Sequence, residues 1–227
     1  MSNITVISPE LQKKYFKQES YIYHTVDLEG EIVVNRDLPI KLFPDYGFVA
    51  SLPNNSIVAG GYVLGLLRGN AKDIGDIDIY SKSEDMFLEL QELLFKQGYI
   101  KKPIPSGILV FADTFSKPGH FDVQLIRTLW FDSPEHVIDT FDFTVCQFAI
   151  QNGFLIFNPM GVFDATRKEL IINRLNFPNT MLKRIVKYEG KGFTITDKNR
   201  NKVDEAVKNA KENPGIEYQL FPLNSAY

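Results

Sequence analysis

The sequence predicts an α/β fold in which a short mixed, partly antiparallel sheet is flanked by helices, with a small helical part at the C-terminal end. Three observations support this prediction. Residues 76–80, DIDIY, alternate strictly in polarity and predict a strand. An amphipathic run after Ser83 predicts a capped helix of about four turns. Two further amphipathic segments beyond residue 175 predict the helical part.

The first half of the chain is expected to contain four elements. Residues 1–50 form an irregular lead-in, with two short apolar runs at 31–34 and 38–43 that would suit an edge hairpin. Residues 56–61 end in two glycines and an apolar run follows them, which predicts a strand, a turn and a short buried helix. The strand at 76–80 and the capped helix come next.

The second half is expected to begin with an antiparallel hairpin. Its predicted strands are residues 108–111 and 121–126, joined by a turn-rich connection at 114–119. A helix is predicted after Pro134, and residues 145–150 suit either a strand or a buried helix. Helices at 182–188 and 202–211 complete the prediction.

Composition excludes several classes of protein. The chain has 227 residues, which favours one large domain over two, and a single cysteine rules out a disulfide scaffold. No run approaches the roughly 20 apolar residues of a membrane helix, and the start lacks the order of a signal peptide. We therefore expect a soluble, cytoplasmic protein. The net charge of -3 argues against a broad nucleic-acid surface but leaves a local basic face open.

Common catalytic motifs are absent from the sequence. It contains no paired Cys and His zinc pattern, no HExxH, no phosphate-binding GxxxxGK[ST] and no GxSxG. His24, His120 and His136 are scattered and are interpreted as ordinary residues, and Cys146 as a buried thiol.

The informative set is the Gly60-Gly61 pair followed by Asp76, Asp78 and Asp122. Carboxylates at i and i+2 of a strand share one face, and a third from a neighbouring strand would complete an oxygen site for Mg²⁺. Backbone amides of the glycine turn, at the start of a helix, can hold phosphates opposite the metal. The alternative is that the aspartates form the solvent side of an edge strand.

These residues lie in a segment that resembles a known family. GGYVLGLLRG at 60–69 and DIDI at 76–79 are similar to the head of the DNA polymerase beta-type nucleotidyltransferase superfamily, nearest to poly(A) polymerases and CCA-adding enzymes. FDFTV at 141–145, the stretch 153–164 and the segment 181–195 resemble later motifs and the neck helix. The resemblance spans about residues 55–196.

The resemblance implies a nucleotidyltransferase with a catalytic domain at 51–175 and a neck-like helical part at 176–227. It implies Mg²⁺ or Mn²⁺ as cofactor and a nucleoside triphosphate such as ATP as substrate. Asp122 would be base or metal ligand for the attacking hydroxyl. The implied metal ligands are Asp76, Asp78 and Asp122. The implied triphosphate contacts are Gly60 and Gly61, and the cations that could offset its charge are Arg68, Lys72 and Arg127.

Three hypotheses follow for the function. The leading one is transfer of NMP from an NTP to a hydroxyl on an RNA 3′ end, a small molecule or a protein. Leu64 and Phe141 replace arginines of the family pattern, and Gly65 replaces the aspartate that follows the first of them, which motivates a second hypothesis of an inactive, antitoxin-like binding or regulatory protein. The third is an unrelated α+β domain. The base, the acceptor and the oligomeric state are left open.

Overall fold

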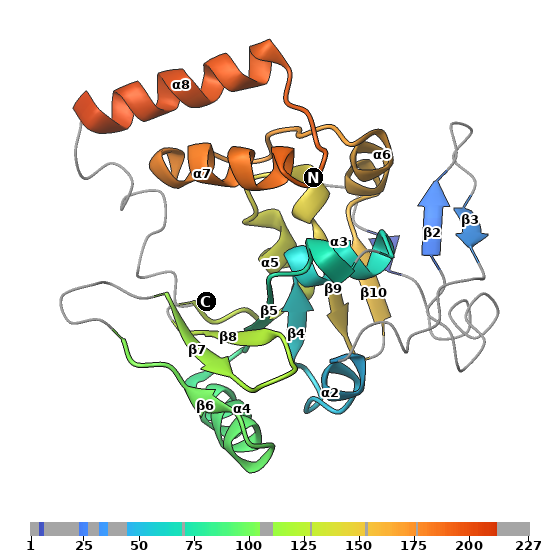
Figure 1. Ribbon diagram of the computed structural model, residues 1–227, viewed down its shortest axis with the longest axis vertical. Coiled ribbons are helices and arrows are strands. Elements are labelled where there is room, and N and C mark those ends of the chain that lie inside the picture. The colour runs from blue at the N-terminus through green and yellow to red at the C-terminus, as the bar shows by residue number, and fades with distance from the viewer. Residues whose placement is uncertain are drawn as a thin grey trace.

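Figure 1 shows the fold of the protein in a computed structural model. It describes residues 5–6, 23–26, 32–35, 45–69, 71–104, 111–127, 129–152, 154–175 and 177–212.

The described strands build one large sheet and one small one. Within the large sheet, β5 and β8 are parallel and all other neighbouring pairs are antiparallel. Its strand order is β1 (Thr5–Val6), β10 (Phe154–Phe157), β9 (Phe148–Gln151), β4 (Ile57–Ala59), β5 (Asp76–Tyr80), β8 (Asp122–Ile126), β7 (Ala112–Ser116) and β6 (Ile100–Lys101). The small sheet pairs β2 (Tyr23–Val26) with β3 (Ile32–Asn35). The predicted mixed, partly antiparallel sheet is confirmed.

The two faces of the central strands contact different helices because strand side chains alternate. On β5, Ile77 and Ile79 are buried in the larger hydrophobic cluster, together with residues of α3 (Gly61–Leu67) and α4 (Glu84–Lys96). Tyr80 lies on the opposite face, in a smaller cluster with Val137 of α5 (Pro134–Asp139). Asp76 and Asp78 share that face, so the α5 side of the sheet carries the polar positions of β5.

Local sequence signals set the beginnings of the helices. The Ser83 side chain accepts a hydrogen bond from the Met86 amide and begins α4. Asn158 does the same for α6 (Pro159–Arg167), where Pro159 occupies the first turn. The described residues also include helix α2 (Tyr46–Ala50) and two 3-10 turns, η2 (Ala71–Asp73) and η3 (Thr144–Cys146).

The C-terminal helices α7 (Pro178–Glu189) and α8 (Asp197–Glu212) lie one above the other in Figure 1. Met181, Ile185 and Tyr188 recur at helical spacing on α7 and are buried in the larger cluster. Val203 and Val207 of α8 join the same cluster. The helical C-terminal part is therefore packed against the rest of the fold.

Three predictions about elements need correction. Residues 114–116 belong to strand β7, because residues 112–116 alternate in burial and pair with β8, so the turn is shorter than predicted. Most of the predicted strand at 108–111 lies outside the described residues. In the predicted edge hairpin, the run 31–34 overlaps β3, and the strand that pairs with β3 is β2. The other predicted run, 38–43, lies outside the described residues. The last helix begins at Asp197 instead of residue 202. The Thr196 hydroxyl accepts a hydrogen bond from the Asn199 amide and so caps the helix at this earlier position.

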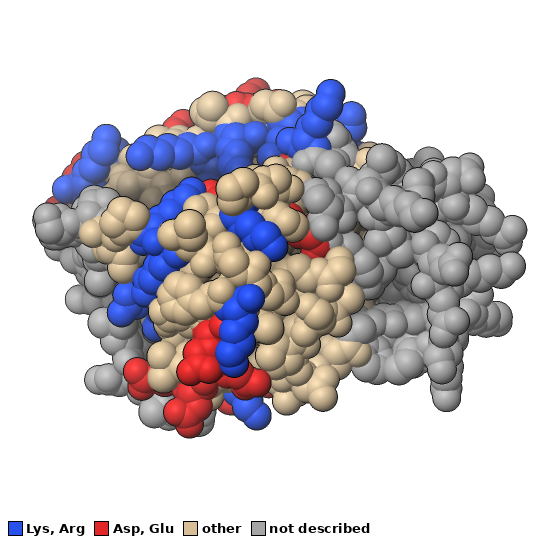
Figure 2. All heavy atoms as spheres, turned by 60° about the horizontal axis from the view of Figure 1, so that its bottom comes forward, with Lys and Arg blue, Asp and Glu red and all other residues tan. Residues whose placement is uncertain are grey.

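Charged side chains are unevenly placed on the surface. Figure 2 shows basic side chains mainly in the upper part of one face and a group of acidic ones in its lower part. Exposed acidic residues include Glu84, Asp85 and Glu89 of α4, whereas Lys183 and Lys187 extend from α7.

Among the described helices, none combines the length and the apolar character that a membrane crossing requires.

Candidate nucleotide site

A pocket of about 450 Å³ lies on the α5 side of the sheet. Its walls come from segments that are distant in the sequence. They include the turn between β4 and α3, strands β5 and β8, the segment between β8 and α5, the segment between α5 and η3, and helix α7. The pocket therefore lies where the central strands meet the C-terminal helical part.

The carboxylates of Asp76 and Asp78 enter this pocket from β5, and both are partly exposed. The parallel register places Asp122 beside Asp76 and Gln124 beside Asp78 on the neighbouring strand. The Gln124 side-chain amide donates a hydrogen bond of 2.8 Å to Asp76 Oδ2. The predicted strand with two aspartates on one face is confirmed.

The two carboxylates form a like-charge pair. The pKa of Asp78 is raised from 3.8 to about 7, mainly by burial and also by the negative charge of Asp76, while Lys187 and Arg184 oppose the shift. Two carboxylates that repel each other in a partly buried pocket are a donor set that suits a hard divalent cation. Such an ion would relieve the repulsion and lower the pKa of Asp78.

The turn before α3 closely approaches the pair. Gly60 has a φ of +80°, and a Cβ added there would lie 3.6 Å from Asp78 Oδ2 and 3.6 Å from the Phe141 ring. A side chain at this position would be strained and would narrow the pocket. Gly61, by contrast, has no neighbour within 4 Å of an added Cβ.

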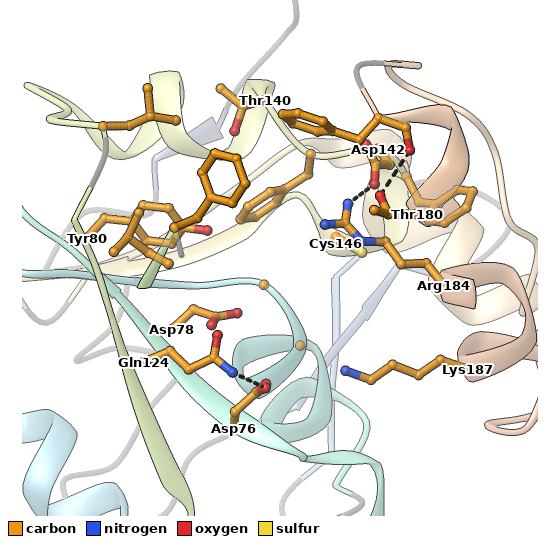
Figure 3. A pocket seen from close by; sticks show the side chains of 18 of the residues that line it. Asp76, Asp78, Tyr80, Gln124, Thr140, Asp142, Cys146, Thr180, Arg184 and Lys187 are labelled. Carbon is orange, nitrogen blue, oxygen red and sulfur yellow. Dashed lines mark hydrogen bonds and ion pairs between the residues drawn. The ribbon is translucent and has the colours of Figure 1, made fainter. Parts of the chain in front are cut away.

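Helix α7 supplies two cations to the opposite wall. Figure 3 shows Arg184 and Lys187 extending from α7 toward the side that carries Asp76, Asp78 and Gln124. Arg184 forms an ion pair with Asp142, whose side chain is only 3% exposed. Both cations contribute to the electrostatic environment of Asp78.

Asp122 has a different environment from the β5 pair. Its carboxylate is 2.6 Å from the Lys102 ammonium, and the two side chains are 37% and 46% exposed. It is not among the residues that line the pocket. Within the described ranges, no three His, Cys, Asp or Glu side chains are grouped so that they could hold a metal ion. The structure thus gathers two of the three predicted carboxylates.

The three predicted triphosphate cations also lie outside the pocket lining. Arg68 forms a 2.8 Å ion pair with Asp73 and stacks over the Phe193 ring. Arg127 pairs with Asp113 at 3.2 Å. Lys72 is exposed in η2. The first two therefore have structural partners within the fold.

Comparison with protein families gives a match over more than half of the chain. The model of the Gabija anti-defense 2 family protein matches residues 37–162. The chain belongs to the Gabija anti-defense 2 family. A curated relative, Gabija anti-defense 2 of Bacillus phage SPbetaL7, is 28% identical over 147 residues, which are 63% of this chain and 35% of the relative. This chain thus spans about a third of that protein's length.

Solved structures resemble this family member in fold. A CCA-adding enzyme in complex with CTP gives a TM-score of 0.53 at 18% identity and covers 73% of this chain and 43% of its own. A CCA-adding enzyme in complex with ATP gives 0.50 at 21% identity, with 68% and 38% covered. The nucleotidyltransferase fold predicted from the resemblance is confirmed for this Gabija anti-defense 2 family chain.

Sequence reasoning did not identify the α7 cations of the Gabija anti-defense 2 fold. Arg184 and Lys187 are about one helical turn apart and lie next to the buried residues of α7, and this spacing could have indicated that both face the same side. Sequence reasoning also did not identify Gln124 as a residue of the pocket. Cys146, predicted to be a buried thiol, lines the pocket with its Sγ 3.0 Å from the Tyr188 hydroxyl. Burial raises the pKa of this thiol to about 11, so it stays protonated at neutral pH.

Proposed function

We propose that this chain is a metal-dependent nucleotidyltransferase module that transfers NMP from an NTP to a hydroxyl acceptor. The observation that carries the proposal is the placement of Asp76 and Asp78 side by side in a pocket whose opposite wall carries Arg184 and Lys187. Paired carboxylates facing cations suit a ligand that combines divalent metal with phosphates.

Asp76 and Asp78 would hold Mg²⁺ or Mn²⁺. Burial of Asp78, together with the negative charge of Asp76 beside it, raises the pKa of Asp78 and is the structural reason to expect an ion there. When bound, the metal would neutralise charge on the phosphates and activate the attacking hydroxyl. Gln124 fixes Asp76 through its hydrogen bond, so the first carboxylate is held in place before any ligand arrives.

The residues around the pair would bind and orient the triphosphate. Lys187 would contact phosphate oxygens directly, and Arg184 would do so while Asp142 orients its guanidinium. The Gly60-Gly61 turn would let phosphates approach the backbone. Asp122 shares the face and register of Asp76, and we propose it as base for the acceptor hydroxyl, which requires that it exchange its contact with Lys102.

The acceptor is proposed by chemical class. It is a hydroxyl on an RNA 3′ end, a protein or a small molecule, in keeping with the family's nucleotidyltransferase fold. Because the matched relative is named for counteracting the Gabija defence, we propose that the transfer serves the same end here. The division into a catalytic part at 51–175 and a neck-like part at 176–227 belongs to this proposal.

A second candidate function is supported by a specific observation. Asp122 forms an ion pair with Lys102. The residue beside Asp78 on strand β8 is Gln124, which carries an uncharged amide instead of a third carboxylate. A pocket that gathers two of the three predicted carboxylates would suit a protein that binds a nucleotide or a partner without catalysis.

One experiment separates the two functions. The 227-residue chain is incubated with Mg²⁺, each α-labelled NTP in turn and pools of RNA, protein or small molecules, and both label transfer and pyrophosphate are measured. We expect transfer by the wild type and a loss of at least about 100-fold in Asp76→Asn and Asp78→Asn. Asp204→Asn, on the exposed side of α8, is the matched control and should retain activity. Nucleotide binding without transfer would favour the second function.

A further inference from the structure

The pocket continues past the carboxylates into an aromatic chamber formed by Tyr80, Phe131 and Phe141. All three side chains line the pocket. Tyr80 is the centre of the group, with its ring centroid 5.6 Å from that of Phe131 and 6.2 Å from that of Phe141. The chamber therefore presents a connected aromatic wall to the ligand space.

This chamber directly adjoins the metal-binding carboxylates. Tyr80 follows Asp78 by two residues on the same strand face, so their Cα atoms are about 7 Å apart. Phe141 lies against the Gly60 turn, 3.6 Å from the position of an added Cβ. A ligand with phosphates at Asp78 would place the group next to its phosphates against these rings.

The polar side chains close to the chamber already have partners. The Thr140 hydroxyl donates a 2.7 Å hydrogen bond to the Val137 carbonyl, and the Asp142 carboxylate is paired with Arg184. The aromatic rings, rather than hydrogen-bonding groups, therefore dominate this part of the pocket.

We propose that the aromatic chamber binds the nucleobase by stacking and that the site consequently prefers purine over pyrimidine triphosphates without distinguishing strongly between adenine and guanine. The inference rests on the proposed binding of a nucleoside triphosphate at Asp76 and Asp78. Stacking on aromatic side chains tolerates any base and grows with the stacked area.

Calorimetric titration of the full chain with Mg²⁺ and α,β-methylene analogues of ATP, GTP, CTP and UTP tests the proposal, with tripolyphosphate as the probe without a base. We expect the two purine analogues to bind within about 3-fold of each other and about 10-fold more tightly than the pyrimidine analogues. Phe141→Leu should weaken purine binding about 10-fold and leave tripolyphosphate binding unchanged. Phe95→Leu removes an aromatic ring from α4, outside the pocket, and should change neither.

The outcomes separate this inference from the proposed function. If tripolyphosphate binds and the base adds no affinity, or if one base is preferred about 100-fold over all others, the stacking proposal is overturned while phosphate binding stands. If neither tripolyphosphate nor any analogue binds, the proposed function fails as well. Phe131→Leu provides a second test of the same chamber in case Phe141→Leu unfolds, and thermal melting identifies that case.

Discussion

The carboxylates of β5 and the carboxylate of β8 lie on the same face of the same sheet, yet their surroundings differ. Asp78 lies in a pocket beside another carboxylate, and its pKa is raised to about 7. Asp122, in register with Asp76, is ion-paired with Lys102. The two aspartates thus differ because Asp78 is more buried and has a like charge beside it, whereas Asp122 is more exposed and has an opposite charge beside it.

This difference indicates that a bound cation would stabilise the charged form of the β5 pair more than that of Asp122. Arg184 and Lys187 offset only part of the effect of burial and of the Asp76 charge, because the pKa of Asp78 is still raised, whereas Lys102 forms an ion pair with Asp122. A ligand that brings a divalent metal therefore gains most at the β5 pair.

The largest expected difference between Asp78 and Asp122 is in how the free energy of unfolding depends on pH. Because the folded protein holds a proton on Asp78 more tightly than the unfolded chain does, stability falls as the pH rises from about 4 through about 7. Without metal, Asp78→Asn should therefore raise the free energy of unfolding at pH 8 by up to about 4 kcal/mol and lose this advantage at pH 4.

Urea denaturation in EDTA at both pH values measures this effect. Asp122→Asn is the matched comparison and should change stability by less than about 1 kcal/mol, because its ion pair is exposed. Equal effects of Asp78→Asn at the two pH values would contradict the raised pKa of Asp78.

The cations near the two acids give the next effect in size. Lys187→Met removes a charge that faces the pocket and should weaken Mg²⁺-nucleotide binding about 10-fold or more. Lys102→Met removes a charge of the same kind beside Asp122 and should change binding less than about 2-fold. Titration calorimetry compares the two variants, and a larger effect of Lys102→Met would indicate that the nucleotide binds beside Asp122 on β8.

The sequence predicted the parts of the site whose signals are local. Alternation at 76–80 placed both aspartates on one face, and Ser83 marked the beginning of α4. Strand β7 was missed because its polar residues are typical of a turn. Asp113 is nevertheless buried there, 2.5 Å from Lys101 and 3.2 Å from Arg127. The ion pairs that stabilise the buried charge of Asp113 come from residues more than ten positions away, so the sequence around Asp113 does not indicate them.

The remaining site features depend on tertiary contacts. The entry of Arg184 and Lys187 into the pocket requires α7 to pack on the core through Met181, Ile185 and Tyr188. The pairing of Asp122 with Lys102 depends on the sheet, because Lys102 follows β6 and its backbone amide donates to the Thr114 carbonyl of β7, the strand that pairs with β8. Neither arrangement follows from the spacing of residues along the chain, although both decide which charges face the ligand.

Binding of Mn²⁺ in the presence of the α,β-methylene analogue of ATP, followed by electron paramagnetic resonance, tests the central claim most directly. We expect saturable binding by the wild type and by Asp122→Asn, and a loss of at least about 10-fold in affinity when Asp76 and Asp78 are both replaced by Asn. Unchanged Mn²⁺ binding in that double variant would contradict the assignment of the metal to the β5 pair.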